Sequence, residues 1–147
     1  MALSIRQLAA QIISEIEAIS LPTTDTPEGM ADDNDVFRGF FGFGQLDVAD
    51  RVFKLIPGLA VRNLQVLNMD EMRIPMAIEV TYIMTPFVFE RITNDFILIA
   101  DTLHDIPAGD ADILDVRPNV GSIQEGEEDN TLRAEMTFDV IWQWTGA

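Results

Sequence analysis

Apolar and polar side chains alternate from Thr131 to Trp144. Successive side chains of a β-strand point to opposite faces, so this alternation predicts a long strand with one buried face. The apolar positions of this segment are Leu132, Ala134, Met136, Phe138, Val140, Trp142 and Trp144. The strand is expected to lie with its apolar face against the core and its other face in solvent.

A second alternation, from Met72 to Thr85, predicts a central strand. We expect Pro75 at the start of this strand or at a sheet edge, where the missing amide hydrogen does no harm. The residues expected to share its buried face are Met76, Ile78, Val80, Tyr82 and Met84.

The N-terminal segment carries apolar residues at the three- and four-residue spacing of an amphipathic helix. Ser4 and Gln7 form a capping-box pattern at its start, and Pro22 is expected to stop it because proline lacks an amide proton. The apolar positions are Ile5, Leu8, Ala9, Ile12, Ile16 and Ile19.

A second helix is predicted from about Phe89 to Asp105, with Arg91 and Asp95 on its polar side. We expect Pro107 and Gly109 to end it. Its apolar face holds Ile92, Phe96, Ile99, Ala100 and Leu103. This helix is expected to cover the sheet.

Shorter strands are predicted at Arg51 to Ile56, Leu59 to Leu67, Ile113 to Val116 and Val120 to Gln124, the last two split by Pro118. Strands that follow one another through short turns favour antiparallel pairing. The sequence therefore predicts an α+β fold, a mostly antiparallel sheet of four to six strands packed by an N-terminal helix and a second helix. Residues 1–147 are expected to form a single domain.

A long loop is predicted at residues 21–50, beyond the length that compact domains usually leave without structure. Its second half reads Val-Phe-Arg-Gly-Phe-Phe-Gly-Phe-Gly from residue 36. Its phenylalanines are Phe37, Phe40, Phe41 and Phe43. Two interpretations stand side by side: these rings fold back as a lid on the core, or they form an arm that docks on a neighbouring subunit. The glycines lack the spacing of a nucleotide-binding loop.

The chain has 147 residues, with 25 acidic against nine basic side chains, a formal net charge of -16 and no cysteine. Disulfides and thiolate metal sites are thereby excluded. Such an excess of negative charge disfavours ordinary nucleic-acid binding, although an acidic wall lets DNA slide past without sticking. On composition alone, solubility or adaptation to salt is the favoured explanation of the charge. The apolar stretches are too short to span a bilayer, so no membrane partner is expected.

Candidate chemistry is sparse in the sequence. The single histidine, His104, lies near the end of the predicted second helix, where a local role fits best. Acidic residues gather at Asp101, Asp105, Asp110, Asp112 and Asp115, but their spacing matches no calcium loop. No catalytic residue, cofactor site or metal site is therefore predicted. The aromatic residues Tyr82, Trp142 and Trp144 are assigned to core packing.

Several segments together resemble the tail terminator proteins, also called tail completion proteins, of long-tailed bacteriophages and gene transfer agents. They are the N-terminal amphipathic helix, the Arg51-Val-Phe-Lys-Leu segment, the Ile78-Glu-Val-Thr-Tyr-Ile-Met-Thr strand that runs into the helix Ile92 to His104, and the closing Arg133-Ala-Glu-Met-Thr-Phe-Asp-Val-Ile-Trp strand. The likeness spans about Leu3 to Trp144 in length, element order and pattern. The 21–50 loop departs from the most compact members.

The resemblance implies a structural virion protein of the tail or neck, made in the bacterial host cytoplasm, and not an enzyme. It implies a hexameric ring at the head-proximal end of the tail tube that stops tube growth, contacts the tail tube protein and the head connector, and lets DNA pass. On this basis Phe37, Phe40, Phe41 and Phe43 are interface candidates. The candidates for an acidic channel or rim are Asp32, Asp33, Asp35, Glu127, Glu128 and Asp129.

Two alternatives stay open. A head-to-tail stopper, connector or tail tube subunit of the same kind of particle has a similar small sheet-and-helix build. A more distant alternative is a small-ligand-binding or hydrolytic α+β domain, although the sequence gathers no convergent set of polar residues.

Overall fold

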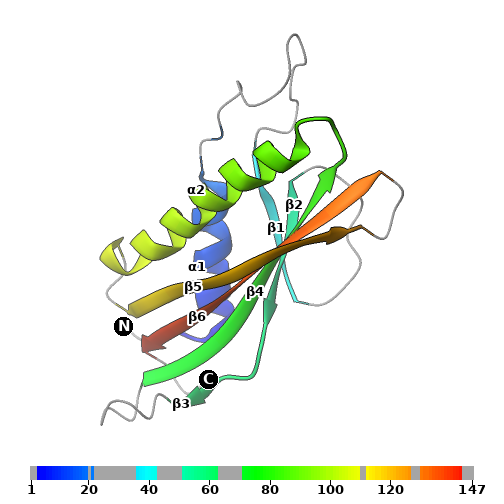
Figure 1. The fold of residues 1–147 in the computed structure, drawn as a ribbon. Helices are drawn as coiled ribbons and strands as arrows, with labels where there is room; N and C mark the ends of the chain where they lie inside the picture. Colours follow the sequence, from blue (N-terminus) through cyan, green and yellow to red (C-terminus); the bar gives the residue numbers. More distant parts are fainter. Residues whose placement is uncertain are drawn as a thin grey trace.

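The computed structural model describes residues 3–19, 21, 36–42, 51–62, 71–109, 112–126 and 130–143. Within them the fold is α+β, as predicted, with two helices and a six-stranded, mostly antiparallel sheet (Figure 1). In chain order the elements are α1 (Ile5–Glu17), β1 (Arg38–Phe41), β2 (Val52–Pro57), β3 (Val61–Arg62), β4 (Glu71–Ile83), α2 (Val88–Gly109), β5 (Ile113–Glu125) and β6 (Thr131–Gln143).

The strand order in the sheet is β1-β2-β4-β6-β5, and β3 also pairs with β4. Both helices pack on the same face of this sheet and share one apolar core with it (Figure 1). All strand pairs are antiparallel except β1 with β2, which is parallel. Within the described residues the edges of the sheet are therefore β1 on one side and β5 on the other.

The predicted capping box begins α1. The Ser4 hydroxyl accepts a hydrogen bond from the Gln7 amide at 3.2 Å, and the Gln7 side chain accepts one from the Ser4 amide at 2.9 Å. These bonds satisfy backbone donors that have no partner within the helix. Leu8, Ile12 and Ile16 are fully buried, so the predicted apolar face is confirmed.

Helix α2 is longer than predicted and continues through Pro107 to Gly109. Proline removes its own hydrogen bond to the carbonyl four residues earlier, and because α2 ends two residues later at Gly109, this loss affects only the last turn. On the predicted polar side of this helix Asp101 is exposed, but the prediction was wrong for Arg91 and Asp95, which are buried, Asp95 completely.

The alternation in β4 and β6 is confirmed. These 13-residue strands pair along their whole length, from Glu71 with Gln143 to Ile83 with Thr131. The buried alternating positions are Met72, Ile74, Met76, Ile78, Val80 and Tyr82 in β4, and Leu132, Ala134, Met136, Phe138, Val140 and Trp142 in β6. Met84, predicted on the same face, lies beyond the strand and is exposed. Trp144 lies outside the described residues.

Pro75 lies in the middle of β4, but at a local edge. The pairing of β2 with β4 stops at Pro57 and that of β3 begins at Val61, so the neighbouring ladder is interrupted beside Pro75. The Pro75 carbonyl accepts a hydrogen bond from the Gly58 amide at 2.7 Å. The missing amide hydrogen of proline is tolerated where no strand partner needs it.

Two predictions are corrected, and a third falls partly outside the described residues. Residues 113–125 form one strand, because β5 absorbs Pro118 through an irregularity in its pairing with β6 between Pro118 and Gly121. The predicted 21–50 loop contains a strand, β1, which pairs with β2. In the segment predicted from Leu59 to Leu67, the described strand is the short β3.

Gly39 in β1 lies where the sheet meets α1. A β-carbon at this position would lie 2.2 Å from the Phe53 ring and 2.8 Å from the side chain of Ile13. We expect Gly39→Ala to lower the free energy of unfolding by about 1 to 3 kcal/mol, because overpacking forces neighbouring side chains or backbone to shift. Urea denaturation checks this, with Gly109→Ala as control, since nothing lies within 4 Å of its β-carbon. Equal stability of both variants would contradict the close approach.

Candidate interaction surfaces

The predicted phenylalanine cluster divides between the core and the surface. Phe37 is 2% exposed, so for this residue the lid interpretation holds and the interface assignment does not. Its ring packs edge to face on Phe53, with centroids 6.2 Å apart. Phe40 and Phe41 are about half exposed on β1, at the sheet edge. Phe43 lies outside the described residues.

A buried ion pair, which the sequence did not predict, anchors this edge. Arg51 lies directly before β2. Its guanidinium donates two hydrogen bonds of 2.8 Å to the carboxylate of Asp95 on α2. The Tyr82 hydroxyl donates to the same carboxylate at 2.9 Å. Both charged side chains are completely buried. A bidentate pair of this kind fixes the orientation of both partners.

Arg51 also organises the backbone around it. Its φ of 61° is in the left-handed region that few non-glycine residues adopt. Its amide donates to the Thr81 carbonyl at 2.8 Å, and its carbonyl accepts from the Arg38 amide at 3.2 Å. The guanidinium carbon lies 6.0 Å from the centre of the Phe37 ring, within reach of a cation-π contact. The ion pair thus ties β1, β2 and α2 together.

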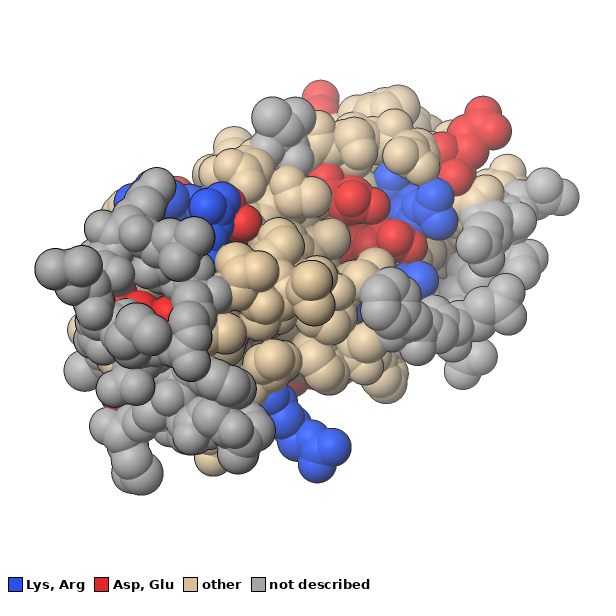
Figure 2. All heavy atoms as spheres, turned by 90° about the horizontal axis from the view of Figure 1, so that it is seen from below, with Lys and Arg blue, Asp and Glu red and all other residues tan. Residues whose placement is uncertain are grey.

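The face of the sheet opposite the helices carries a ladder of charged residues. The Glu79 carboxylate lies 3.4 Å from the Lys54 amine and 3.6 Å from a nitrogen of Arg133. Towards the other end of the strands, Arg73 pairs with Asp139 at 2.7 Å. Figure 2, a view from below, likewise shows acidic and basic atoms next to one another within a largely uncharged surface. Partly exposed pairs of this kind contribute little stability.

An apolar hollow of about 400 Å³ lies between α2 and the edge strand β5. It is lined by Ile92, Thr93 and Phe96 of α2, Gly121, Ser122 and Ile123 of β5, and Ala134 of β6. Ile123 is 44% exposed although it lies on the helix side of the sheet, opposite Ala134. A separate group of exposed apolar residues surrounds the turn from β4 into α2: Ile83, Met84, Phe87 and Phe89.

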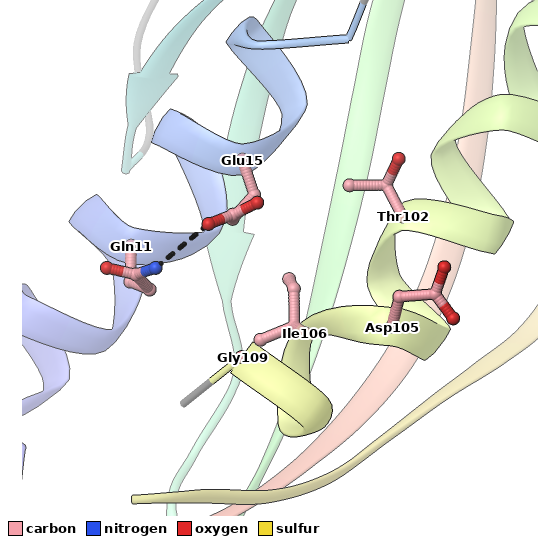
Figure 3. Close-up of a pocket in the computed structure, with 6 residues that line it drawn as sticks. All are labelled: Gln11, Glu15, Thr102, Asp105, Ile106 and Gly109. Atoms are coloured by element: carbon pink, nitrogen blue, oxygen red, sulfur yellow. Dashed lines mark hydrogen bonds between the residues drawn. The ribbon is translucent and has the colours of Figure 1, made fainter. Parts of the chain in front are cut away.

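A second hollow, of about 250 Å³, lies between the two helices (Figure 3). Gln11 and Glu15 of α1 face it and are joined by a hydrogen bond of 3.1 Å. The Asp105 carboxylate on α2 points away from α1 in Figure 3, so the two acidic groups do not converge. This hollow therefore offers no paired carboxylates for acid-base chemistry.

The other predicted candidates are placed as follows. His104 is exposed, and its ring nitrogen lies 3.3 Å from the carboxylate of the neighbouring Asp105. Among the described residues no three acidic or histidine side chains gather as metal ligands. The acidic channel or rim candidates lie outside the described residues: Asp32, Asp33, Asp35, Glu127, Glu128 and Asp129.

The described part of the chain holds no helix of the length and apolarity that crossing a membrane requires. A scan against models of known protein families finds no match for this chain, and no curated protein matches it.

Proposed function

We propose that this protein is a tail terminator of a long-tailed bacteriophage or gene transfer agent. In this role copies of the chain form a ring, expected to be hexameric, at the head-proximal end of the tail tube, where they stop tube growth and join the tail to the head connector. The proposal rests on the sequence resemblance. The element order of the fold, a helix, strands, a second helix and two closing strands, agrees with that resemblance.

The observation that carries the assembly part is the presence of two different exposed apolar surfaces at the two sheet edges. One edge presents Phe40 and Phe41 on β1, and the other presents Ile123 and the apolar hollow beside β5. Subunits of a ring meet head to tail, so each needs two unlike surfaces that fit each other. The two sheet edges of this chain present such a pair of unlike apolar surfaces.

The position of charge in the sequence supports passage of DNA. Asp32, Asp33 and Asp35 form one acidic cluster in the sequence and Glu127, Glu128 and Asp129 form another, and neither cluster contains a basic residue. In the proposed ring the acidic candidates of residues 32–35 and 127–129 belong to the channel or rim, where repulsion of phosphate lets DNA slide.

The direct test is negative-stain microscopy of the purified protein together with a mass measurement, alone and with tubes assembled from a tail tube protein. We expect closed rings with six times the 16.4 kDa chain mass, or rings that cap the tube ends. Long cylinders formed by this chain itself would favour a tail tube subunit. Monomers that neither close into rings nor cap tubes would contradict the proposal.

The exposed aromatic edge gives a prediction by mutation. We expect Phe40→Ser combined with Phe41→Ser to leave the melting temperature nearly unchanged, because both side chains are about half exposed, and to abolish ring formation. Size-exclusion chromatography with light scattering measures the assembly. The matched control is Leu59→Ser, which removes an apolar side chain that is 82% exposed and belongs to neither edge. Rings of normal mass in the double variant would exclude β1 from the contact.

A further inference from the structure

We propose that the contact between copies joins the β1 edge of one chain to the β5 edge of the next, with Phe41 of the first copy inserted in the apolar hollow between α2 and β5 of the second. This inference rests on the proposed function in one respect, the head-to-tail association of identical chains. It adds which surfaces meet, in which direction and at which residues.

The hollow has the shape and chemistry for an aromatic ring. Ile92 and Ala134 form its buried floor, and Phe96 and Ile123 are its larger apolar walls. Its volume of about 400 Å³ leaves space for a phenyl group. Gly121 contributes no side chain on the β5 side, so an aromatic residue on a neighbouring strand can cover the backbone at that point, as aromatic residues do beside edge glycines.

Phe41 is on the correct face to reach this hollow. It is paired with Leu55, whose side chain is in the core, so Phe41 lies on the helix side of the sheet. Phe40 is paired with Lys54 and lies on the opposite side. When two sheets join edge to edge their faces continue, and the helix side of β1 then meets the helix side of β5, where the hollow opens.

The lengths of the two edges also agree. β1 has four residues, and the part of β5 beyond its irregularity, Gly121 to Glu125, pairs with β6 without interruption. The irregularity between Pro118 and Gly121 limits a new strand to this short stretch, because bulges and proline interrupt pairing along a sheet edge. Strand pairing over so few residues buries little surface, and the inserted Phe41 side chain adds apolar contact to it.

The strand directions set the direction of the pairing. β1 runs parallel to β2, and β5 runs antiparallel to both, so copies whose faces continue place β1 of one antiparallel to β5 of the next. With Phe41 opposite Gly121, this brings Arg38 beside Gln124 and Glu125, and Arg38 and Glu125 are both exposed. Copies that each carry a net charge of -16 repel one another, so this local pair of opposite charges favours the contact. The occupant of the hollow is therefore a second copy of this chain.

The absence of cysteine permits a direct crosslinking test. In the antiparallel arrangement Phe40 lies opposite Ser122 on the outer side of the joined sheets, within the range of a disulfide. We expect a mixture of the Phe40→Cys and Ser122→Cys variants to form a disulfide-linked dimer under mild oxidation, and the variant with both substitutions to give a ladder of higher species. Leu114→Cys, at the other end of the same edge strand and also exposed, is the matched control and should not crosslink to Phe40→Cys.

A charge reversal tests the direction independently. Arg38→Glu in the Phe40→Cys chain should lower the crosslinked fraction roughly tenfold, and Glu125→Arg in the Ser122→Cys chain should restore it. Absence of the disulfide, or equal crosslinking by the Leu114→Cys control, overturns the inference. Rings that form without the disulfide would contradict only the inferred contact and would still agree with the proposed function. A ladder that grows into open polymers instead of closed rings would keep the contact and contradict the terminator function.

Discussion

Replacing Asp95 with alanine is expected to lower the free energy of unfolding by about 3 to 5 kcal/mol. The substitution leaves the Arg51 guanidinium completely buried without the carboxylate that neutralises it, and removes the acceptor of the Tyr82 hydroxyl. An uncompensated buried charge is among the most destabilising changes known in proteins. Small domains have a free energy of unfolding of about 5 to 15 kcal/mol, so the expected loss is a large part of it. Chemical denaturation followed by tryptophan fluorescence measures it.

Two further variants separate the ion pair from general effects on the helix. Asp101→Ala removes an exposed carboxylate from the same helix and should change stability by less than about 0.5 kcal/mol. Arg51→Met combined with Asp95→Leu removes both charges and should cost less than Asp95→Ala alone, because neither member of the pair is left buried without the other. A stable Asp95→Ala variant, or a double variant less stable than it, would contradict the burial of the pair.

The ion pair matters for the proposed assembly because of where it is. Arg51 precedes β2, bonds to the backbone of Arg38 at the start of β1 and contacts the ring of Phe37. The strand that presents Phe40 and Phe41 at the sheet edge is thus held by a buried group on α2. α2 also forms one wall of the apolar hollow at the opposite edge. One helix therefore positions both surfaces of the proposed contact.

The fold class could be predicted because the two strongest patterns are unambiguous. The apolar residues of β4 and β6 recur almost throughout at the two-residue period of a strand, and Ser4 with Gln7 marks the start of α1. The strand β1 was missed because its glycine and phenylalanine residues do not alternate with polar ones. It forms through its neighbours, since Gly39 lets Phe53 and Ile13 approach closely.

The buried ion pair was missed for a different reason. Asp95 falls at a core-facing position of the spacing that Val88, Ile92, Ile99 and Leu103 define, so the pattern contained a signal. Its charge suggested solvent instead, because carboxylates are seldom buried without a partner. The partner, Arg51, is 44 residues earlier in the sequence, and only the three-dimensional packing brings the two together. Sequence periodicity places a residue on a face but does not reveal which distant residue meets it.

Trp142→Ala is the second change with a large expected effect, about 3 to 5 kcal/mol in the free energy of unfolding. The side chain is completely buried in β6, and its indole nitrogen donates a hydrogen bond of 3.0 Å to the Leu3 carbonyl. The Leu3 amide in turn donates to the Gln143 carbonyl at 2.8 Å. The indole thus packs in the core and, through its hydrogen bond, holds the segment before α1 against β6. Calorimetry should show a melting temperature lower by on the order of 10 °C.

The indole hydrogen bond and the ring volume can be separated. Trp142→Phe keeps an aromatic ring in the core but loses the donor to Leu3, so its cost should be clearly smaller than that of Trp142→Ala. Thr137→Ala, at an exposed position of the same strand, is the control for changes in β6 that leave the core intact. A Trp142→Ala melting temperature within a few degrees of the parent would contradict the burial.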